Sequence, residues 1–96
     1  MAEPQASSSD PSLGQILGRN LRHERGRLGI SQEELGFRAG LHRNQIGQIE
    51  RGERSPRLHT IIKLAGGLGV SPCELLDGMS WIQPHVQTGG FEVRNP

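Results

Sequence analysis

The segment from Arg43 to Gln48 contains four side chains that can each make paired hydrogen bonds. They are Arg43, Asn44, Gln45 and Gln48. Arginine can bind guanine through two N–H groups, while asparagine and glutamine can bind adenine through an amide N–H and the amide oxygen. These side chains therefore have the chemistry needed to read base edges in the major groove of DNA, which admits an α-helix.

The same segment has the apolar spacing of a helix that would present these side chains. Ile46 and Ile49 are three residues apart and would face inward, and Gly52 is placed to end the helix just after Arg51. On a period of 3.6 residues the opposite face carries Arg43, Asn44, Gly47 and Gln48. That face contains nothing that requires burial, so we expect it to be a binding face.

A second short helix is expected just before it. Ser31 and Glu34 form a capping box, in which the serine hydroxyl accepts from the Glu34 N–H and the Glu34 carboxylate accepts from the Ser31 N–H. Leu35 and Ala39 share one face, and Gly40 provides the left-handed residue that ends a helix. The sequence thus predicts two short helices joined by a tight turn.

These residues resemble the lambda-repressor-like (XRE) helix-turn-helix family. The resemblance covers roughly Leu13 to Gly78 and is specific because several motifs occur in the right order at the right separations. They are Leu21-Arg-x-x-Arg25, Leu28-Gly-x-Ser-Gln-Glu-Glu-Leu35, Ala39-Gly-Leu41, Ile46-x-Gln-Ile-Glu-Arg-Gly52, Pro56, Leu68-Gly-Val-Ser71 and Glu74-Leu-Leu76. The resemblance implies an all-α fold of five helices that binds double-stranded DNA.

The resemblance also implies roles for individual residues. It gives the base contacts to Arg43, Asn44 and Gln48, with Gln45 and His42 at the margin. It gives contacts with the DNA backbone to Gln32, Arg51, Arg54 and Arg57, and it makes Arg25 and Glu50 a structural ion pair. Two positions depart from the family pattern. His42 replaces the usual serine or threonine cap, which we expect to weaken that helix start by about 1 kcal/mol, and Gly47 lacks the side chain that is usual there.

Three further helices complete the predicted domain, which spans residues 12–78. Ser12 with Gln15 predicts a first helix that ends at Gly29. Ser55 and Pro56 suit the cap and first turn of a fourth helix, with an apolar stripe that begins at Leu58. Ser71-Pro72 opens a fifth, in which Cys73 is expected to be a small core residue. Residues 1–11 read as a disordered arm.

Residues 79–96 form a C-terminal tail of different character. Trp81, Ile82, Val86, Phe91 and Val93 surround the turn signal Gly89-Gly90, which indicates a small β-hairpin or an extended tail. Two interpretations remain open. The tail either covers the core of its own chain or serves as a dimerisation element that pairs with a second subunit.

Composition limits the classes of function. The chain has 96 residues, of which 32% are apolar, so it forms one small domain. Its single cysteine excludes an internal disulfide, the four histidines are scattered without metal-ligand spacing, and no long apolar run or signal peptide is present. We therefore expect a cytoplasmic protein with no cofactor, no metal, no membrane association and no enzymatic activity.

Charge is concentrated in the middle of the chain. The net charge is only +1, but residues 19–57 contain nine arginines and five acidic residues, a local charge of +4. Together with the motifs, this predicts a sequence-specific transcriptional regulator of repressor type, binding as a homodimer because one short helix reads few base pairs. The alternative is an antitoxin-like or coactivator-like module that holds a protein partner, with the tail as part of its contact surface.

Overall fold

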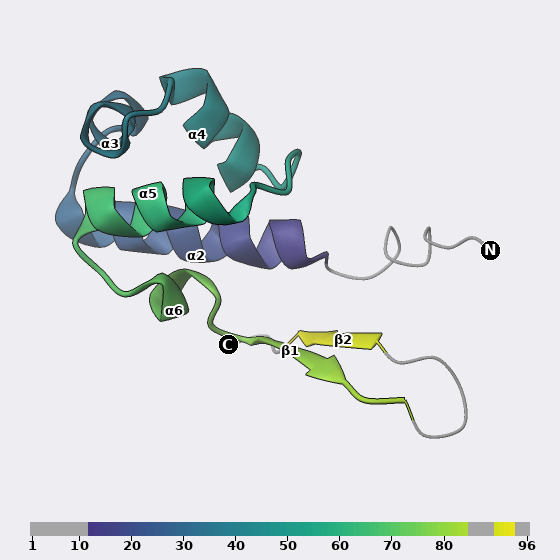
Figure 1. Cartoon of the computed structure of the whole chain (residues 1–96). Coiled ribbons are helices and arrows are strands. Elements are labelled where there is room, and N and C mark those ends of the chain that lie inside the picture. Colours follow the sequence, from purple (N-terminus) through teal and green to yellow (C-terminus); the bar gives the residue numbers. More distant parts are fainter. Residues whose placement is uncertain (1–11, 85–89, 94–96) are drawn as a thin grey trace.

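The computed structural model describes residues 12–84 and 90–93, which form five helices and a two-stranded sheet (Figure 1). The helices are α2 (Leu13–Leu28), α3 (Gln32–Ala39), α4 (Arg43–Glu50), α5 (Leu58–Leu68) and α6 (Pro72–Leu75), and the strands are β1 (Met79–Ile82) and β2 (Gly90–Val93). The predicted five-helix fold with a C-terminal hairpin is confirmed. The predicted arm at 1–11, together with Val86 and Gly89 of the tail, lies outside the described residues.

One apolar cluster holds the helices together. Its largest fully buried members come from five helices, and they are Leu21, Leu35, Ile46, Ile49, Leu64 and Leu75. In Figure 1 α2 and α5 run across the middle of the molecule, with α3 and α4 above them and α6 and the hairpin below. The predicted inward spacing of Ile46 and Ile49 therefore anchors α4 and fixes which of its faces points outward. Among the described residues, no helix is both long and apolar enough to cross a membrane.

Side-chain caps begin most of the helices. Ser12 and Gln15 form the complete predicted capping box at the start of α2. At α3 only half of the predicted box is present, because the Ser31 hydroxyl accepts from the Glu34 N–H at 2.9 Å. The Glu34 carboxylate accepts instead from Arg38, one turn further along the same helix, at 3.0 Å. The nearby arginine thus competes successfully with the backbone N–H for this carboxylate.

The start of α5 differs from the prediction. The chain stays outside the helix through Ser55 and Pro56, so α5 begins at Leu58 with Arg57 as its extended N-cap residue. No side chain caps this helix. Leu58 was predicted to begin the apolar stripe, but it is 74% exposed. The buried face of α5 begins two residues further on, at Thr60.

The prediction for Cys73 was also wrong. Ser71 caps α6 as expected, accepting from the Cys73 N–H at 3.2 Å, but Cys73 itself is exposed. A helix of a single turn can bury only one narrow side, and in α6 that position belongs to Leu75. Asn20 of α2 fixes this turn by donating to the carbonyl oxygens of Leu75 at 2.8 Å and Asp77 at 3.0 Å.

Helices α2 and α4 meet at a glycine. A Cβ added at Gly18 would lie 2.5 Å from the Ile49 carbonyl oxygen and 2.6 Å from that of Glu50. Gly18 and Gly26 both lower the helix propensity of α2, but an added Cβ at Gly26 would meet nothing within 4 Å. Gly18 is therefore required for the close packing of α2 against α4. Gly26 lowers the stability of α2 and is not needed for packing.

The hairpin pairs β1 and β2 in antiparallel register, with Trp81 opposite Phe91 and Met79 opposite Val93. The Trp81 and Phe91 rings make an edge-to-face contact with centroids 5.1 Å apart. Met79 packs against the helical core, but Trp81 and Phe91 are 56% and 64% exposed. The described part of the tail therefore meets the helical body at Met79 and where β2 lies against α2, and its aromatic pair is largely exposed.

Candidate nucleic-acid interface

Helices α3 and α4 form a compact helix-turn-helix. Gly40 ends α3 in the left-handed conformation, at φ 71°, as predicted. Gly36 lies where the turn crosses α3, and a Cβ there would be 2.5 Å from the Leu41 carbonyl oxygen. These two glycines let α4 start close against α3, which fixes the angle at which α4 leaves the body.

His42 begins α4 as an effective cap. Its Nδ1 accepts a hydrogen bond from the Asn44 N–H at 3.0 Å. An imidazole nitrogen thus accepts the hydrogen bond that a serine or threonine oxygen would accept at this position, while the expected weakening of this helix start stays a prediction. The cap also holds the Asn44 backbone at the start of the outward face.

The outward face of α4 presents Arg43 and Asn44 as exposed side chains and Gln48 as a half-exposed one. Together with Gln32, Gly47 and Arg51 they line a hollow of about 180 Å³, the reading hollow. The structure thus brings the three main predicted base-reading residues together with two predicted backbone contacts. Gln45 does not line the reading hollow.

Gly47 is buried rather than part of the exposed face. A Cβ added there would lie 3.1 Å from Nη1 of Arg51 and 3.5 Å from Oε1 of Gln32. The missing side chain therefore provides the room in which the Arg51 and Gln32 side chains cross α4. The sequence shows only that the usual side chain is missing at this position, and the packing shows that Gly47 lines the reading hollow.

Beneath the reading hollow, Arg25 and Glu50 form an ion pair with two hydrogen bonds. Arg25 Nε and Nη2 donate to the carboxylate at 2.6 and 3.0 Å, and this contact raises the pKa of Arg25 above its usual value. Gln32 Nε2 donates to the same carboxylate at 3.0 Å. The Glu50 side chain is only 3% exposed, so it links α2, the start of α3 and the end of α4 from inside.

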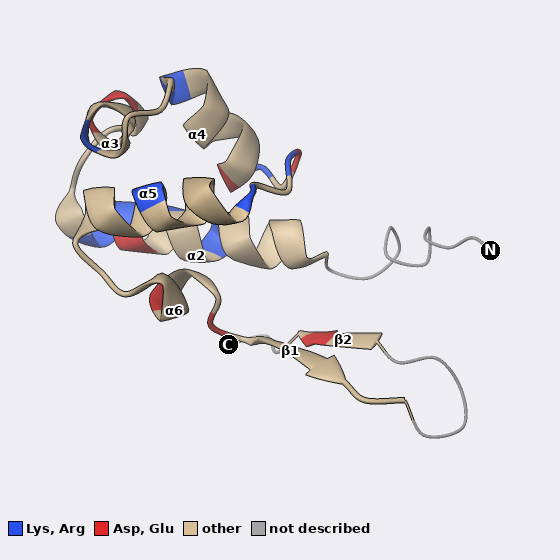
Figure 2. Cartoon of the chain, in the orientation of Figure 1, with Lys and Arg blue, Asp and Glu red and all other residues tan. Residues whose placement is uncertain are grey.

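The exposed charges around the reading hollow are partly paired. Arg51 binds Glu53 at 2.8 and 3.2 Å, which lowers the pKa of the Glu53 carboxyl and raises the pKa of Arg51. Arg43 lies 3.7 Å from Glu33. Figure 2 shows acidic and basic residues side by side in the loop after α4. The side chains of these pairs are exposed, so a phosphate can replace the carboxylate at little cost.

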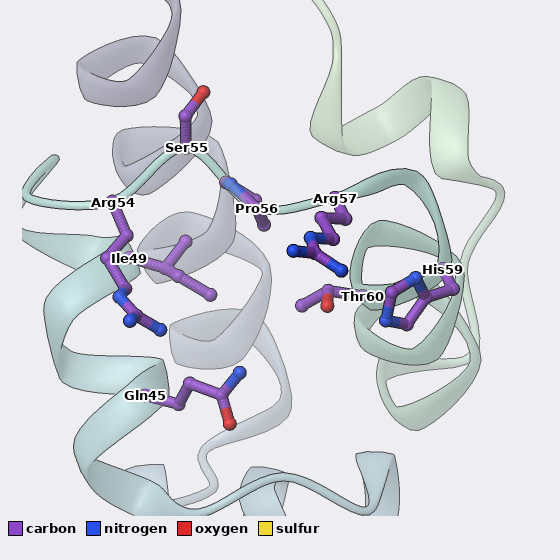
Figure 3. A pocket seen from close by; sticks show the side chains of 8 residues that line it. All are labelled: Gln45, Ile49, Arg54, Ser55, Pro56, Arg57, His59 and Thr60. Atoms are coloured by element: carbon purple, nitrogen blue, oxygen red, sulfur yellow. The ribbon is translucent and has the colours of Figure 1, made fainter.

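A second hollow, of about 440 Å³, lies between α4, the 51–57 loop and α5, and is called here the α4–α5 hollow (Figure 3). Arg54 and Arg57 extend into it, and Gln45 lines it from α4. His59 and Thr60 line it from the first turn of α5. Sequence reasoning found the two arginines but missed His59 and Thr60, whose position depends on where α5 begins.

Comparison with known proteins agrees with this geometry. The helix-turn-helix family model matches residues 21–75. Control protein C.SmaI of Serratia marcescens is 41% identical over 73 residues, which are 76% of this chain and 87% of the relative. The restriction-modification controller protein C.AhdI from Aeromonas hydrophila has a similar structure, with a TM-score of 0.63 and 44% identity over 65% of this chain and 94% of the other.

A structure of the P22 c2 repressor protein in complex with a synthetic operator is similar as well, with a TM-score of 0.61 and 36% identity over 67% of this chain and 97% of that one. The matched family segment includes both helices of the motif and the ion pair beneath them. It ends before the hairpin, which starts at Met79. The chain therefore belongs to the lambda-repressor-like helix-turn-helix family.

Proposed function

We propose that this chain is a DNA-binding transcriptional regulator that binds as a homodimer and reads the major groove with α4. The observation that carries the proposal is the reading hollow, where Arg43, Asn44 and Gln48 stand on one outward face beside Gln32 and Arg51. A helix with such side chains fits the major groove and can form paired hydrogen bonds with base edges.

The residues divide into two roles. Arg43, Asn44 and Gln48 contact base edges and determine which sequence is bound. Gln32 and Arg51 at the border of the hollow, and Arg54 and Arg57 beyond it, contact phosphates and fix the register of the helix on the duplex. The Glu50 carboxylate holds the Gln32 amide in place for its phosphate contact. The ion pair of Arg25 and Glu50 therefore positions a DNA-contacting side chain without touching DNA itself.

Two subunits are proposed because α4 is short. Its eight residues reach only a few base pairs, and two-fold symmetric proteins double the site by reading two half-sites about one helical turn apart. The relatives support this class of function. They include proteins named control or controller proteins and a repressor in complex with a synthetic operator. The proposed role places the protein in the cytoplasm.

The first test is selection of bound duplexes from a random pool at near-physiological salt, together with the mass of the protein in solution. A two-fold symmetric site with half-site centres about 10 base pairs apart and a dimeric mass are expected. No enrichment by a well-folded protein would contradict the proposal.

The residue roles are tested on the selected site and on a random duplex. Asn44→Ala and Gln48→Ala should each weaken the selected site by about 1 to 3 kcal/mol while leaving random DNA nearly unchanged. Arg54→Ala is the matched control, because loss of a phosphate contact should weaken both duplexes alike. Equal losses on both duplexes for the two amide variants would contradict their assignment to bases.

A further inference from the structure

We infer that His42 makes the sequence specificity of DNA binding depend on pH, because only its neutral imidazole can cap α4. The inference rests on the proposed function and concerns how that function is regulated. It requires no contact between His42 and DNA. The chain distinguishes its own site from other DNA best while His42 is neutral, and it loses part of this discrimination as the pH falls.

The cap fixes the protonation state of His42. Its Nδ1 accepts a hydrogen bond from the Asn44 N–H at 3.0 Å. A ring nitrogen that accepts a hydrogen bond carries no proton, so this contact assigns the neutral form with its proton on Nε2. In the protonated imidazole both nitrogens are donors. Protonation therefore removes the acceptor and leaves the Nδ1–H and the Asn44 N–H facing each other.

The first turn of α4 depends on this one side-chain acceptor. The His42 carbonyl oxygen accepts from the Gln45 and Ile46 N–H groups, at 2.9 and 3.3 Å, so the Asn44 N–H is bound by the imidazole instead. The first turn contains no acidic residue that could replace it. A positive charge at this end of the helix also opposes the helix dipole. Protonation thus removes the cap and adds repulsion at the same place.

The neighbouring charges are already engaged. The charged residues of α3 and α4, the two helices that the turn joins, form ion pairs of Glu33 with Arg43, Glu34 with Arg38 and Glu50 with Arg25. His42 itself forms no ion pair with a described residue. Its side chain is exposed, so it exchanges protons with the solvent. Histidine is the side chain that changes charge between about pH 5 and about pH 8.

The cap acts on residues that are proposed to read bases. It holds the backbone of Asn44, which lines the reading hollow beside Arg43. Paired hydrogen bonds with a base edge need a fixed geometry, so a loosened first turn must be ordered again on the selected site, at a cost in affinity. Random DNA is held mainly by phosphate contacts, which carry no sequence information. The loss therefore falls on specificity rather than on binding in general.

The test compares the full parent chain with His42→Ser, His42→Ala and His59→Gln. Serine caps a helix at any of these pH values and alanine at none, while His59 is an exposed histidine of α5 and serves as the matched control. Affinities for the selected duplex and a random duplex are measured from about pH 8 to about pH 5.5 at constant ionic strength. The ratio of the two affinities is the readout, because charge gained by the other histidines strengthens both duplexes alike.

The ratio for the parent chain should fall about fivefold as the pH drops, which corresponds to the loss of one helix cap. His59→Gln should show the same fall. His42→Ser should keep the high ratio over the whole range, and His42→Ala should show the low ratio throughout. In the free parent chain, the ring nitrogen NMR shifts of His42 should report a proton on Nε2 at the high-pH end. The backbone amide shift of Asn44 should then move as His42 becomes protonated.

Two results would overturn the inference and leave the proposed function intact. One is a parent chain that keeps its ratio over the whole pH range. The other is a His42→Ser variant that loses as much of its ratio as the parent chain does. A parent chain that selects no DNA sequence at any pH would refute the proposed function, and the inference with it. A ratio that falls only in the chains that keep His42 supports both.

Discussion

Glu50 is the residue on which the DNA-binding face depends most, because its buried carboxylate binds both Arg25 and Gln32. Glu50→Gln should destabilise the fold by about 3 kcal/mol, since it leaves the Arg25 charge without its counterion. The double variant Arg25→Met, Glu50→Leu should lose less than that, because no charge is stranded. Urea unfolding of Glu50→Gln, of Arg25→Met, of Glu50→Leu and of the double variant measures this, and a double-variant loss equal to the sum of the Arg25→Met and Glu50→Leu losses would contradict it.

Glu53 is expected to act against DNA binding. Its carboxylate occupies Arg51 in the free protein, and that contact lowers the pKa of Glu53, so it stays ionised at neutral pH. Glu53→Gln should raise affinity about two- to fivefold, by freeing Arg51 and removing a charge that repels phosphate. The gain should be equal on selected and random duplexes and should shrink at high salt.

A matched control for this effect is Glu34→Gln. Glu34 pairs with Arg38, one turn further along α3, and neither residue lines the reading hollow. The Glu34→Gln variant removes one negative charge, as Glu53→Gln does, but from an exposed ion pair that lies outside the reading hollow. An equal gain from Glu34→Gln would show that total charge, rather than release of Arg51, is responsible.

At the scale of single residues, the sequence predicted side chains whose neighbours are local and missed those that depend on packing. Asn44 and Gln48 could be assigned because the period of α4 sets their face. Thr60 could not, because its burial depends on where α5 starts and on the loop packed over it. The period of α4 puts Gly47 on the outward face. Gly47 is nevertheless buried, because the side chains of Gln32 and Arg51 lie over it.

The contact between α2 and α4 gives a sharp test at the scale of elements. Gly18→Ala should destabilise the fold by about 1 to 3 kcal/mol, because its Cβ would overlap the Ile49 carbonyl oxygen. Gly26→Ala lies in the same helix in open space and should stabilise the fold by up to about 1 kcal/mol. Thermal or urea unfolding of both variants tests this, and a shift of the same sign in both would contradict it.

Helix starts were predictable where a serine stands just before the first helical residue of an apolar period. Ser12, Ser31 and Ser71 each cap a helix as expected. Ser55 and Pro56 carry an equally good local signal at the start of α5, yet the helix begins later. A cap signal is a local preference of about 1 kcal/mol, and the packing of a loop can outweigh it.

At the scale of the whole molecule, the hairpin is nearly independent of the helical body. Figure 1 places it across α2 and α5 from α4, and Glu92 is the only charged residue in its described part (Figure 2). The sequence predicted the hairpin from its residues but could not place it, because the alternation of apolar residues does not say which body the apolar face meets. Among the described residues, the structure shows Met79 packed against the core and β2 in contact with α2.

Removal of the hairpin tests this arrangement. A chain that ends at Gly78 should unfold cooperatively with a stability within about 1 kcal/mol of the full chain, because Trp81 and Phe91 are mostly exposed and, among the described hairpin residues, Met79 is the one packed on the apolar core. In the full chain, Trp81 is the only tryptophan, and its emission should stay that of an exposed ring when duplex is added, since α4 lies on the far side.

A loss of several kcal/mol in the shortened chain would show that the hairpin supports the core. A dimer that becomes monomeric on shortening, with helical stability retained, would instead show that the aromatic pair contacts a second copy.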